Sequence, residues 1–313
     1  MALGQAARML FTVVALVSAV VVVRYLSDYY VIHLYASQKA AIAVANRSPI
    51  VMPTTDEILY FNFGVGDRIH DDDDRLVDHI RAQIARQSPS RPHRLADISG
   101  RRDFSQHGQS ALVDRLLGGR RGGFFVDCGA FDGEDLSNTI FFELERNWTG
   151  LLIEANPKYH RTLLEKNRRA FVLGACLSPT ARPSRLTFQP ASYLGGLVDK
   201  FFPGHLDAIK HDRLNATDIT VNCYPFNAIM AAVGVTHIDY FSLDIEGPEF
   251  EVLQTIDWRR LRIDVLTIES PVGGGEGKVA KLANIRKMFA NTKMYREATT
   301  IGPDVVFERL VGV

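Results

Sequence analysis

The sequence is poor in cysteine, in tryptophan and in net charge. It holds three cysteines (Cys128, Cys176 and Cys223) and two tryptophans among 313 residues. So few cysteines, odd in number, exclude the disulfide framework of a small secreted domain. Lys plus Arg and Asp plus Glu each total 36, so the net charge is zero and nothing global indicates a nucleic-acid partner. The 46% hydrophobic content is ample for a sizeable core.

The sequence also lacks an uncharged apolar run long enough for a complete membrane span. Residues 9–23, MLFTVVALVSAVVVV, fall short of a hydrocarbon core about 30 Å thick. Arg24 can snorkel and nearby tyrosines can form an interfacial belt. With these flanking residues at the membrane interface, the run can still serve as an anchor. We predict a short tail over residues 1–8 and an uncleaved transmembrane signal anchor over residues 9–27. A cleaved signal peptide is the alternative, although no small-x-small site follows the run.

The membrane orientation stays open at this stage. One basic residue precedes the apolar run and three follow it within about twenty residues, which mildly favours a cytosolic body. Sequons at Asn46, Asn147 and Asn215 favour a lumenal one. We expect Asn147 to lie against a strand, where a glycan has little room.

Residues 28–105 show little apolar periodicity. They contain the four-acid run Asp71–Asp74 and a stretch rich in Arg, Pro and Ser over residues 86–102. Such composition is typical of a solvated, partly disordered stem. We therefore place the folded domain at residues 106–313, with a leading helix over residues 109–117.

The domain is organised around Phe124–Gly133, FFVDCGAFDG. The apolar residues 124–126 predict a buried parallel strand, and Gly129 and Gly133 predict a tight turn that lets backbone approach a ligand. Apolar residues at helical spacing follow from Leu136. This pattern is the first half of a nucleotide-binding βαβ unit, whose ligand lies beyond the carboxyl end of the strand.

Charge in the turn bears on the identity of the ligand. Asp132, Glu134 and Asp135 would repel a pyrophosphate, which argues against NAD or FAD. S-adenosylmethionine has no phosphate and offers a sulfonium, an ammonium and a ribose diol. A second strand, residues 150–153, ends in Glu154, and an acid there accepts hydrogen bonds from ribose hydroxyls in this fold class.

Strands and helices alternate after this unit, which predicts a mostly parallel sheet covered on both faces. Strands are expected at 171–173, 239–243, 263–268 and 304–310, and helices at 157–168, 225–233, from 248, and at 278–291. Residues 293–298 can pair with the last strand as an antiparallel hairpin. We interpret residues 179–222 as an insertion over the ligand face that carries substrate selection. No metal site is predicted, because His205 and His211 lie six apart, which is not a zinc spacing.

Asp244 and Glu246 alternate at the end of the strand over residues 239–243. One of them is positioned to face the ligand crevice, while the other braces a loop. We take both as candidate catalytic residues. The alternative is that the acids of this segment only cap the helix that Pro248 begins.

Four segments together resemble the FkbM-type S-adenosylmethionine-dependent methyltransferase family, over about Phe124 to Leu310. They are VDCGAFDGEDLSNT (126–139), WTGLLIEANP (148–157), IDYFSLDIEGPEFEVL (238–253) and IDVLTIE (263–269). The resemblance implies a doubly wound, Rossmann-like class I methyltransferase fold with an antiparallel C-terminal strand. The candidate cofactor-binding residues are Asp127, Gly129, Ala130, Asp132, Gly133, Glu154 and Ser178.

Two functions follow as hypotheses. The first is a membrane-anchored enzyme that binds S-adenosylmethionine and methylates a hydroxyl, with Asp244 as the base. The second follows from the anchor, the stem and the first two motifs, which are similar to those of animal membrane proteins related to Star. That resemblance implies an inactive trafficking factor that assists export of membrane-bound growth-factor precursors from the endoplasmic reticulum to the Golgi. Either protein would lie in endoplasmic reticulum, Golgi or endosomal membranes, and the second would bind a membrane-protein client.

Overall fold

The computed structural model describes residues 69–87, 91–96, 101–201, 209, 217–269 and 275–310, with the backbone alone for 275–278. All of them belong to one compact unit, Leu59–Val313. The predicted tail and anchor (1–27), the sequons at Asn46 and Asn215, and both histidines of the insertion lie outside the described residues. None of the helices in the described part of the chain is long and apolar enough to cross a membrane.

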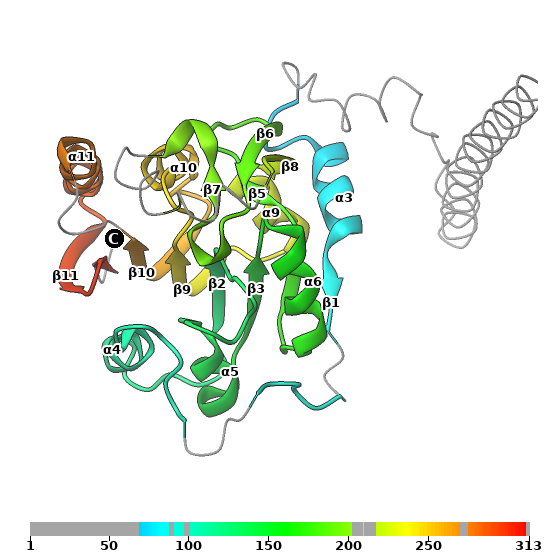
Figure 1. The fold of residues 1–313 in the computed structure, drawn as a ribbon. Coiled ribbons are helices and arrows are strands. Elements are labelled where there is room, and N and C mark those ends of the chain that lie inside the picture. The colour runs from blue at the N-terminus through cyan, green and yellow to red at the C-terminus, as the bar shows by residue number, and fades with distance from the viewer. Residues whose placement is uncertain are drawn as a thin grey trace, which may run out of the picture. The chain divides into compact units, whose positions relative to one another are not determined.

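The centre of the domain is an eight-stranded mixed sheet. Figure 1 shows its strands side by side, from β11 to β1. In spatial order they are β1 (Ala85–Arg86), β4 (Phe171–Leu173), β3 (Thr149–Ile153), β2 (Phe124–Cys128), β9 (His237–Leu243), β10 (Arg262–Glu269), β12 (Asp304–Arg309) and β11 (Tyr295–Ile301). The strands from β4 to β10 run parallel, whereas β12 is antiparallel to both of its neighbours. The predicted parallel sheet with a C-terminal antiparallel hairpin is therefore confirmed.

Helices cover both faces of this sheet because its strands are apolar on both sides. The helices are α3 (Asp74–Gln83), α4 (Gln109–Leu116), α5 (Ile140–Arg146), α6 (Pro157–Lys166), α9 (Phe226–Val233), α10 (Glu249–Thr255) and α11 (Gly275–Thr292). Val126 of β2 belongs to a core cluster with residues of α3, α9, α10 and α11, whereas its neighbour Phe125 packs with residues of α4, α5 and α6. Successive strand residues thus feed opposite cores, as a doubly wound fold requires.

The segment over residues 69–86 belongs to the folded domain. The expected start of this domain at residue 106 is therefore wrong, because the domain already includes these earlier residues. Asp73 caps α3 by accepting a hydrogen bond from the backbone amide of Arg75 (2.9 Å). Leu76 and Ile80 are fully buried and join the main core. This part of the expected stem is therefore an amphipathic helix followed by the edge strand β1.

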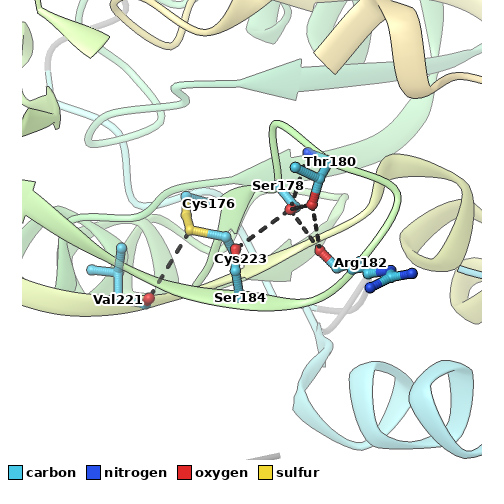
Figure 2. The surroundings of a disulfide bond; sticks show 7 residues. All are labelled: Cys176, Ser178, Thr180, Arg182, Ser184, Val221 and Cys223. Carbon is cyan, nitrogen blue, oxygen red and sulfur yellow. Dashed lines mark hydrogen bonds between the residues drawn. A yellow bond between two sulfur atoms is a disulfide. The ribbon is translucent and has the colours of Figure 1, made fainter. Parts of the chain in front are cut away.

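The expected insertion over residues 179–222, together with the residues on either side of it, forms a second, smaller sheet. Its strand order is β5 (Cys176–Leu177), β8 (Ile219–Tyr224), β6 (Ser184–Gln189) and β7 (Gly196–Leu197), with short 3₁₀ turns η1 (Ser192–Leu194) and η2 (Val198–Lys200). A disulfide joins Cys176 of β5 to Cys223 of β8 (Figure 2). The sequence left open whether these two cysteines approach each other. Cys128 of β2 is a buried free thiol.

The position of Asn147 is not the one we expected, which was against a strand. It is exposed at the end of α5, in the left-handed region (φ 55°), two residues before β3 begins. The side chain that follows it, Trp148, is buried and donates a hydrogen bond to the carbonyl of Arg120 (2.8 Å). The sequon therefore presents its asparagine to solvent while its middle residue anchors the chain.

Candidate functional site

The turn after β2 lies between the ends of β3 and β9. The backbone amides of Gly129 and Ala130 both donate to the carbonyl of Ile153, at 3.0 and 3.1 Å. Gly129 has a φ of +82°, and a Cβ there would overlap the carbonyl oxygen of Asp244. Only glycine fits this position, because both the backbone angle and the close approach exclude a side chain.

Glu154 follows β3 and is 7% exposed. Its Oε2 accepts from the backbone amide of Phe131 (2.8 Å), and its Oε1 accepts from the amide of Asn156 (2.6 Å). Burial raises the pKa of Glu154 to about 7, against the lowering effect of these amides. Because each carboxylate oxygen can accept a second hydrogen bond, Glu154 retains the capacity to bind a ribose diol.

A first pocket opens beside Glu154 and contains about 650 Å³ of empty space. Its lining comes from the first turn, the segments after β3 and β4, the insertion and the loop after β9: Gly129, Phe131, Ile153, Glu154, Ala155, Asn156, Ala175, Cys176, Leu177, Phe188, Ser192, Tyr193, Gly195, Leu197, Asp244, Ile245, Glu246 and Pro248. Residues of the insertion therefore form part of the wall of this pocket, whereas the position of the insertion over a ligand and its role in substrate selection stay predictions.

A second pocket of about 760 Å³ shares part of this wall. Both pockets are lined by Gly129, Phe131, Tyr193, Asp244 and Glu246. The second pocket adds the acids Asp127, Asp135, Glu269 and Asp304, together with the polar residues Gln106, Gln109, Ser137 and Asn138. The two hollows thus meet at the carboxyl ends of β2 and β9, where a parallel sheet of this class places its ligands.

Three carboxylates gather at this meeting point. Oxygen atoms of Asp244, Glu246 and Glu269 all lie within 4.8 Å of one another. Burial together with the charge of Glu246 raises the pKa of Glu269 to about 8. Burial, Glu269 and Glu246 raise the pKa of Asp244 well above its ordinary value. Glu269 can therefore take up and release a proton near neutral pH, and carboxylate oxygens are also the ligands that Mg²⁺ and Ca²⁺ prefer.

The loop that carries Asp244 and Glu246 is shaped by Glu249. One oxygen of this fully buried carboxylate accepts from the amides of Ile245 (3.2 Å) and Gly247 (3.0 Å), while the other binds Nζ of Lys281. The alternative reading, in which the acids of this segment only cap the next helix, is wrong, because no side chain caps α10 and Glu249 holds the loop before it. Asp244 and Glu246 instead line the pockets.

The remaining predicted cofactor residues divide into two groups. Asp127 and Ala130 line the second pocket, and Oδ2 of Asp127 accepts from the hydroxyl of Thr139 (2.7 Å). Asp132, Gly133 and Ser178 line neither pocket. Their contacts instead shape the turns in which they lie.

Asp132, Gly133 and Ser178 each fix a turn. Oδ1 of Asp132 accepts from the backbone amides of Glu134 and Asp135, two and three positions later, both at 2.8 Å. Gly133 has a φ of +81°, and a Cβ there would overlap the side chain of Leu163. The hydroxyl of Ser178 donates to the carbonyl of Arg182 (2.6 Å; Figure 2).

The three acids of the turn do not all face a pocket, contrary to the expectation from the sequence. Glu134 is buried and binds Nζ of Lys166 (2.5 Å), and Asp132 lies 3.6 Å from the same ammonium. Of the three acids expected to repel a pyrophosphate, only Asp135 lines a pocket. The helix also begins later than expected, at Ile140, because Leu136 adopts a left-handed backbone (φ 59°).

Sequence reasoning missed several residues of the second pocket. Glu269 ends β10 and Asp304 begins β12, at the same edge of the sheet as Asp244. The rule that carboxyl ends of parallel strands share an edge would have selected Glu269. No comparable signal marks Tyr193, which is 56% exposed and reaches both pockets from the insertion.

A second acidic group lies at the opposite edge of the sheet, formed by His237, Asp239 and Asp264. The guanidinium of Arg120 binds both carboxylates, and Arg262 donates to Asp264 (2.8 Å). The positive charges of these arginines balance the two acids, so this group ties strand ends together.

Comparisons with known proteins bear on the whole domain. The sequence profile described as "Methyltransferase FkbM domain" matches residues 127–295, which are 169 of the 313 residues. Among solved structures, the methyltransferase FkbM of Methylobacillus flagellatus KT is 17% identical, covers 60% of this chain and has a TM-score of 0.35; this chain covers 43% of that one. The precorrin-6y C5,15-methyltransferase of Geobacter metallireducens GS-15 is 16% identical over 63% of this chain and 84% of its own, with a TM-score of 0.30. No curated protein matches the chain.

Proposed function

We propose that this chain, which belongs to the methyltransferase FkbM family, binds S-adenosylmethionine in its first pocket and a methyl acceptor in its second. The observation that carries the proposal is the buried carboxylate of Glu154, which lies in the first pocket beside the Gly129 turn. A buried acid with spare acceptor capacity at the end of the second strand suits a ribose diol.

The residues of the first pocket fit the chemistry of the cofactor. Glu154 would accept the ribose hydroxyls, and the absence of a side chain at Gly129 leaves room at the point where the two pockets meet. Apolar side chains after β4 and from the insertion, including Leu177, Phe188 and Leu197, form a surface suited to a flat base. Asp127 and Asp244 line the second pocket, and in their ionised form they would stabilise the cationic end of the cofactor there.

Methyl transfer to a hydroxyl needs a group that removes its proton. When bound, S-adenosylmethionine supplies an electrophilic methyl group on its sulfonium. Asp244 lines both pockets, and its raised pKa makes it a stronger base than an ordinary carboxylate. Glu246 and Glu269 tune that basicity by their charge, and Glu269 can share the proton taken up by Asp244.

Isothermal titration of the full chain with S-adenosylmethionine and S-adenosylhomocysteine tests the cofactor site. We expect both to bind and Glu154→Ala to abolish the heat signal. Glu297→Ala, which removes an exposed acid paired with Arg286 outside both pockets, is the matched control and should bind normally. A folded wild-type chain that shows no heat with either ligand would defeat the proposal.

The membrane anchor, the residence in endoplasmic reticulum, Golgi or endosomal membranes and the Star-like trafficking role stay predictions. Residues 9–27 lie outside the described residues, and the family match covers only residues 127–295. The trafficking hypothesis predicts that Glu154→Ala leaves client export intact, so loss of export in that variant counts against it.

A further inference from the structure

We propose that the Cys176–Cys223 disulfide positions one wall of the cofactor pocket, so that the redox state of this cysteine pair and the binding of the cofactor are coupled. The inference rests on the proposed function, because it takes the first pocket as the site of S-adenosylmethionine. It adds two residues that the proposed reaction itself does not use.

Cys176 is itself part of the pocket lining, between Ala175 and Leu177. It lies in β5, a strand of two residues at the edge of the smaller sheet. The strand pairs with β8 through only two residue pairs, Cys176 with Cys223 and Leu177 with Tyr224. Two pairs make a weak ladder, so the covalent bond is the strongest tie between this wall and the rest of the smaller sheet.

The partner strand β8 is firmly held. It pairs with β6 through five residue pairs, and β6 pairs with β7 through Phe188 and Leu197, which also line the pocket. At its other end, the hydroxyl of Tyr224 hydrogen-bonds to α3, through His79 (3.1 Å) and Gln83 (2.9 Å). The disulfide therefore connects the wall after β4 to the wall supplied by the insertion.

The pocket is also the route by which a reductant reaches this bond. Cys223 is fully buried, whereas Cys176 is 8% exposed and lines the first pocket. A dithiol reductant attacks a sulfur, the sulfur–sulfur bond breaks, and two cysteine thiols form while the dithiol closes to a cyclic disulfide. A cofactor that fills the pocket would cover Cys176 and slow this attack.

Coupling must act in both directions. If the cofactor binds the oxidised wall more tightly than the reduced wall, then cofactor binding also stabilises the disulfide against reduction by the same free energy. Two thiol groups need more room than a bonded pair, and Cys223 has none to spare in its buried position. The wall over residues 175–177 is the side that can yield, toward the pocket.

The same bond bears on the orientation that the sequence left open. Disulfides persist in oxidising compartments and are rare where cellular thiols keep cysteines reduced. A pocket wall that depends on Cys176–Cys223 therefore favours a lumenal or extracellular domain over a cytosolic one.

The first test measures S-adenosylhomocysteine affinity by calorimetry with the full chain, oxidised and after treatment with dithiothreitol. We expect reduction to raise Kd by about 5- to 150-fold, the usual range of coupling between sites. The double variant Cys176→Ser/Cys223→Ser should bind as weakly as the reduced chain and ignore dithiothreitol. Cys128→Ala, which removes the buried thiol outside the pocket linings, should keep the response.

The second test measures how fast dithiothreitol releases thiols with and without S-adenosylhomocysteine. At a ligand concentration about ten times Kd, release should slow about elevenfold, because only the unliganded fraction reacts. A bond that is reduced from the folded state at a place the ligand does not cover would not show this protection. This second readout also decides the matter if the reduced chain or the double variant fails to fold.

The outcomes separate the two proposals. A folded, oxidised chain that binds neither ligand overturns the proposed function. A chain that binds S-adenosylhomocysteine equally well in both redox states, with thiol release unaffected by ligand, overturns the redox coupling and leaves the proposed function intact.

Discussion

The backbone amide of Phe131 donates a hydrogen bond of 2.8 Å to Oε2 of Glu154, which joins the turn after β2 to the acid after β3. Phe131 adopts a left-handed backbone (φ 50°), and its ring packs on Tyr159 with 4.1 Å between ring centroids. This hydrogen bond holds the carboxylate in place and uses only one of the two acceptor sites of Oε2. A bound ligand can therefore still contact Glu154, and its affinity can depend on the charge of this carboxylate.

Cofactor affinity should therefore depend on pH. The pKa of Glu154 is about 7, so the carboxylate that would accept both ribose hydroxyls is mostly protonated at pH 6 and mostly ionised at pH 8. We expect Kd for S-adenosylhomocysteine to rise about tenfold from pH 8 to pH 6. Titrations with adenosine should show the same slope, since adenosine keeps the diol and lacks the amino-acid groups.

The control for this pH dependence is Glu154→Gln, which should bind more weakly and with no such slope. Glu269→Gln, which removes a titrating acid from the second pocket alone, should keep the slope. A slope that persists in Glu154→Gln would assign the titration to another group.

Stability should show the opposite dependence on pH in the unliganded chain. The folded pKa of Glu154, about 7, exceeds its ordinary value of 4.5. Its contribution is therefore fully present below about pH 4.5 and is lost as pH rises through 7, by roughly 3 kcal/mol at most. Urea unfolding between pH 5 and 8 measures this loss. Glu154→Gln should flatten that part of the profile, and an unchanged profile in the variant would contradict the assignment.

Much of the fold was predictable because its signals are local. Apolar runs that end in an acid marked β3 and β9, and their order along the chain placed Glu154 and Asp244 at one edge of the sheet. The role of Gly129 was predictable for the same reason, since a turn after a buried strand needs a residue without a side chain.

What the sequence did not predict depends on distant partners. The helix α3 packs on α9, which lies about 150 positions later in the chain. The residues near α3 in sequence therefore do not show what its apolar face packs against. The disulfide joins cysteines 47 positions apart, and only the folding back of the insertion brings them together. The acid Glu134 turns away from the pocket because Lys166, on α6, neutralises it there.

A matched pair of glycines tests the first turn. Gly129→Ala forces a Cβ against the carbonyl oxygen of Asp244 in a left-handed backbone, whereas Gly234 has nearly the same φ (+80°) and open space around its Cα. We expect Gly234→Ala to cost about 1 kcal/mol of unfolding free energy, the conformational term alone. Gly129→Ala should cost clearly more and abolish cofactor binding. Equal costs with binding retained would show that the close approach is not required.

A buried ion pair fixes the loop behind this turn. Arg168 is fully buried, and its Nε donates to Oε1 of Glu143 (2.7 Å). Arg168→Met would leave the buried Glu143 carboxylate with only His93 (3.2 Å) and the backbone amide of Arg169 (2.8 Å), so we expect a loss of about 3–5 kcal/mol in urea unfolding. The exposed pair between Arg286 and Glu297 is the control, and Arg286→Met should cost less than about 1 kcal/mol. Similar costs for the two variants would contradict the structural role of Arg168.

Asp244→Asn separates catalysis from binding. Asparagine keeps the shape of the side chain and leaves the hydrogen bond from the backbone amide of residue 244 to the carbonyl of Cys128 (3.1 Å) in place, so cofactor binding should persist. The variant cannot take up the hydroxyl proton, and the loss of a general base lowers transfer by about 10²–10⁴-fold. The measurement is transfer of tritium from methyl-labelled S-adenosylmethionine to a hydroxyl acceptor found by screening.

The pH profile of the same reaction identifies the base. Because Asp244 must be ionised to act, the wild-type rate should rise with pH through its raised pKa. Glu246 is one of the charges that raise this pKa, so Glu246→Gln should move the rise to lower pH. A profile that stays in place in Glu246→Gln, or full activity in Asp244→Asn, would transfer the role of base to another residue of the second pocket.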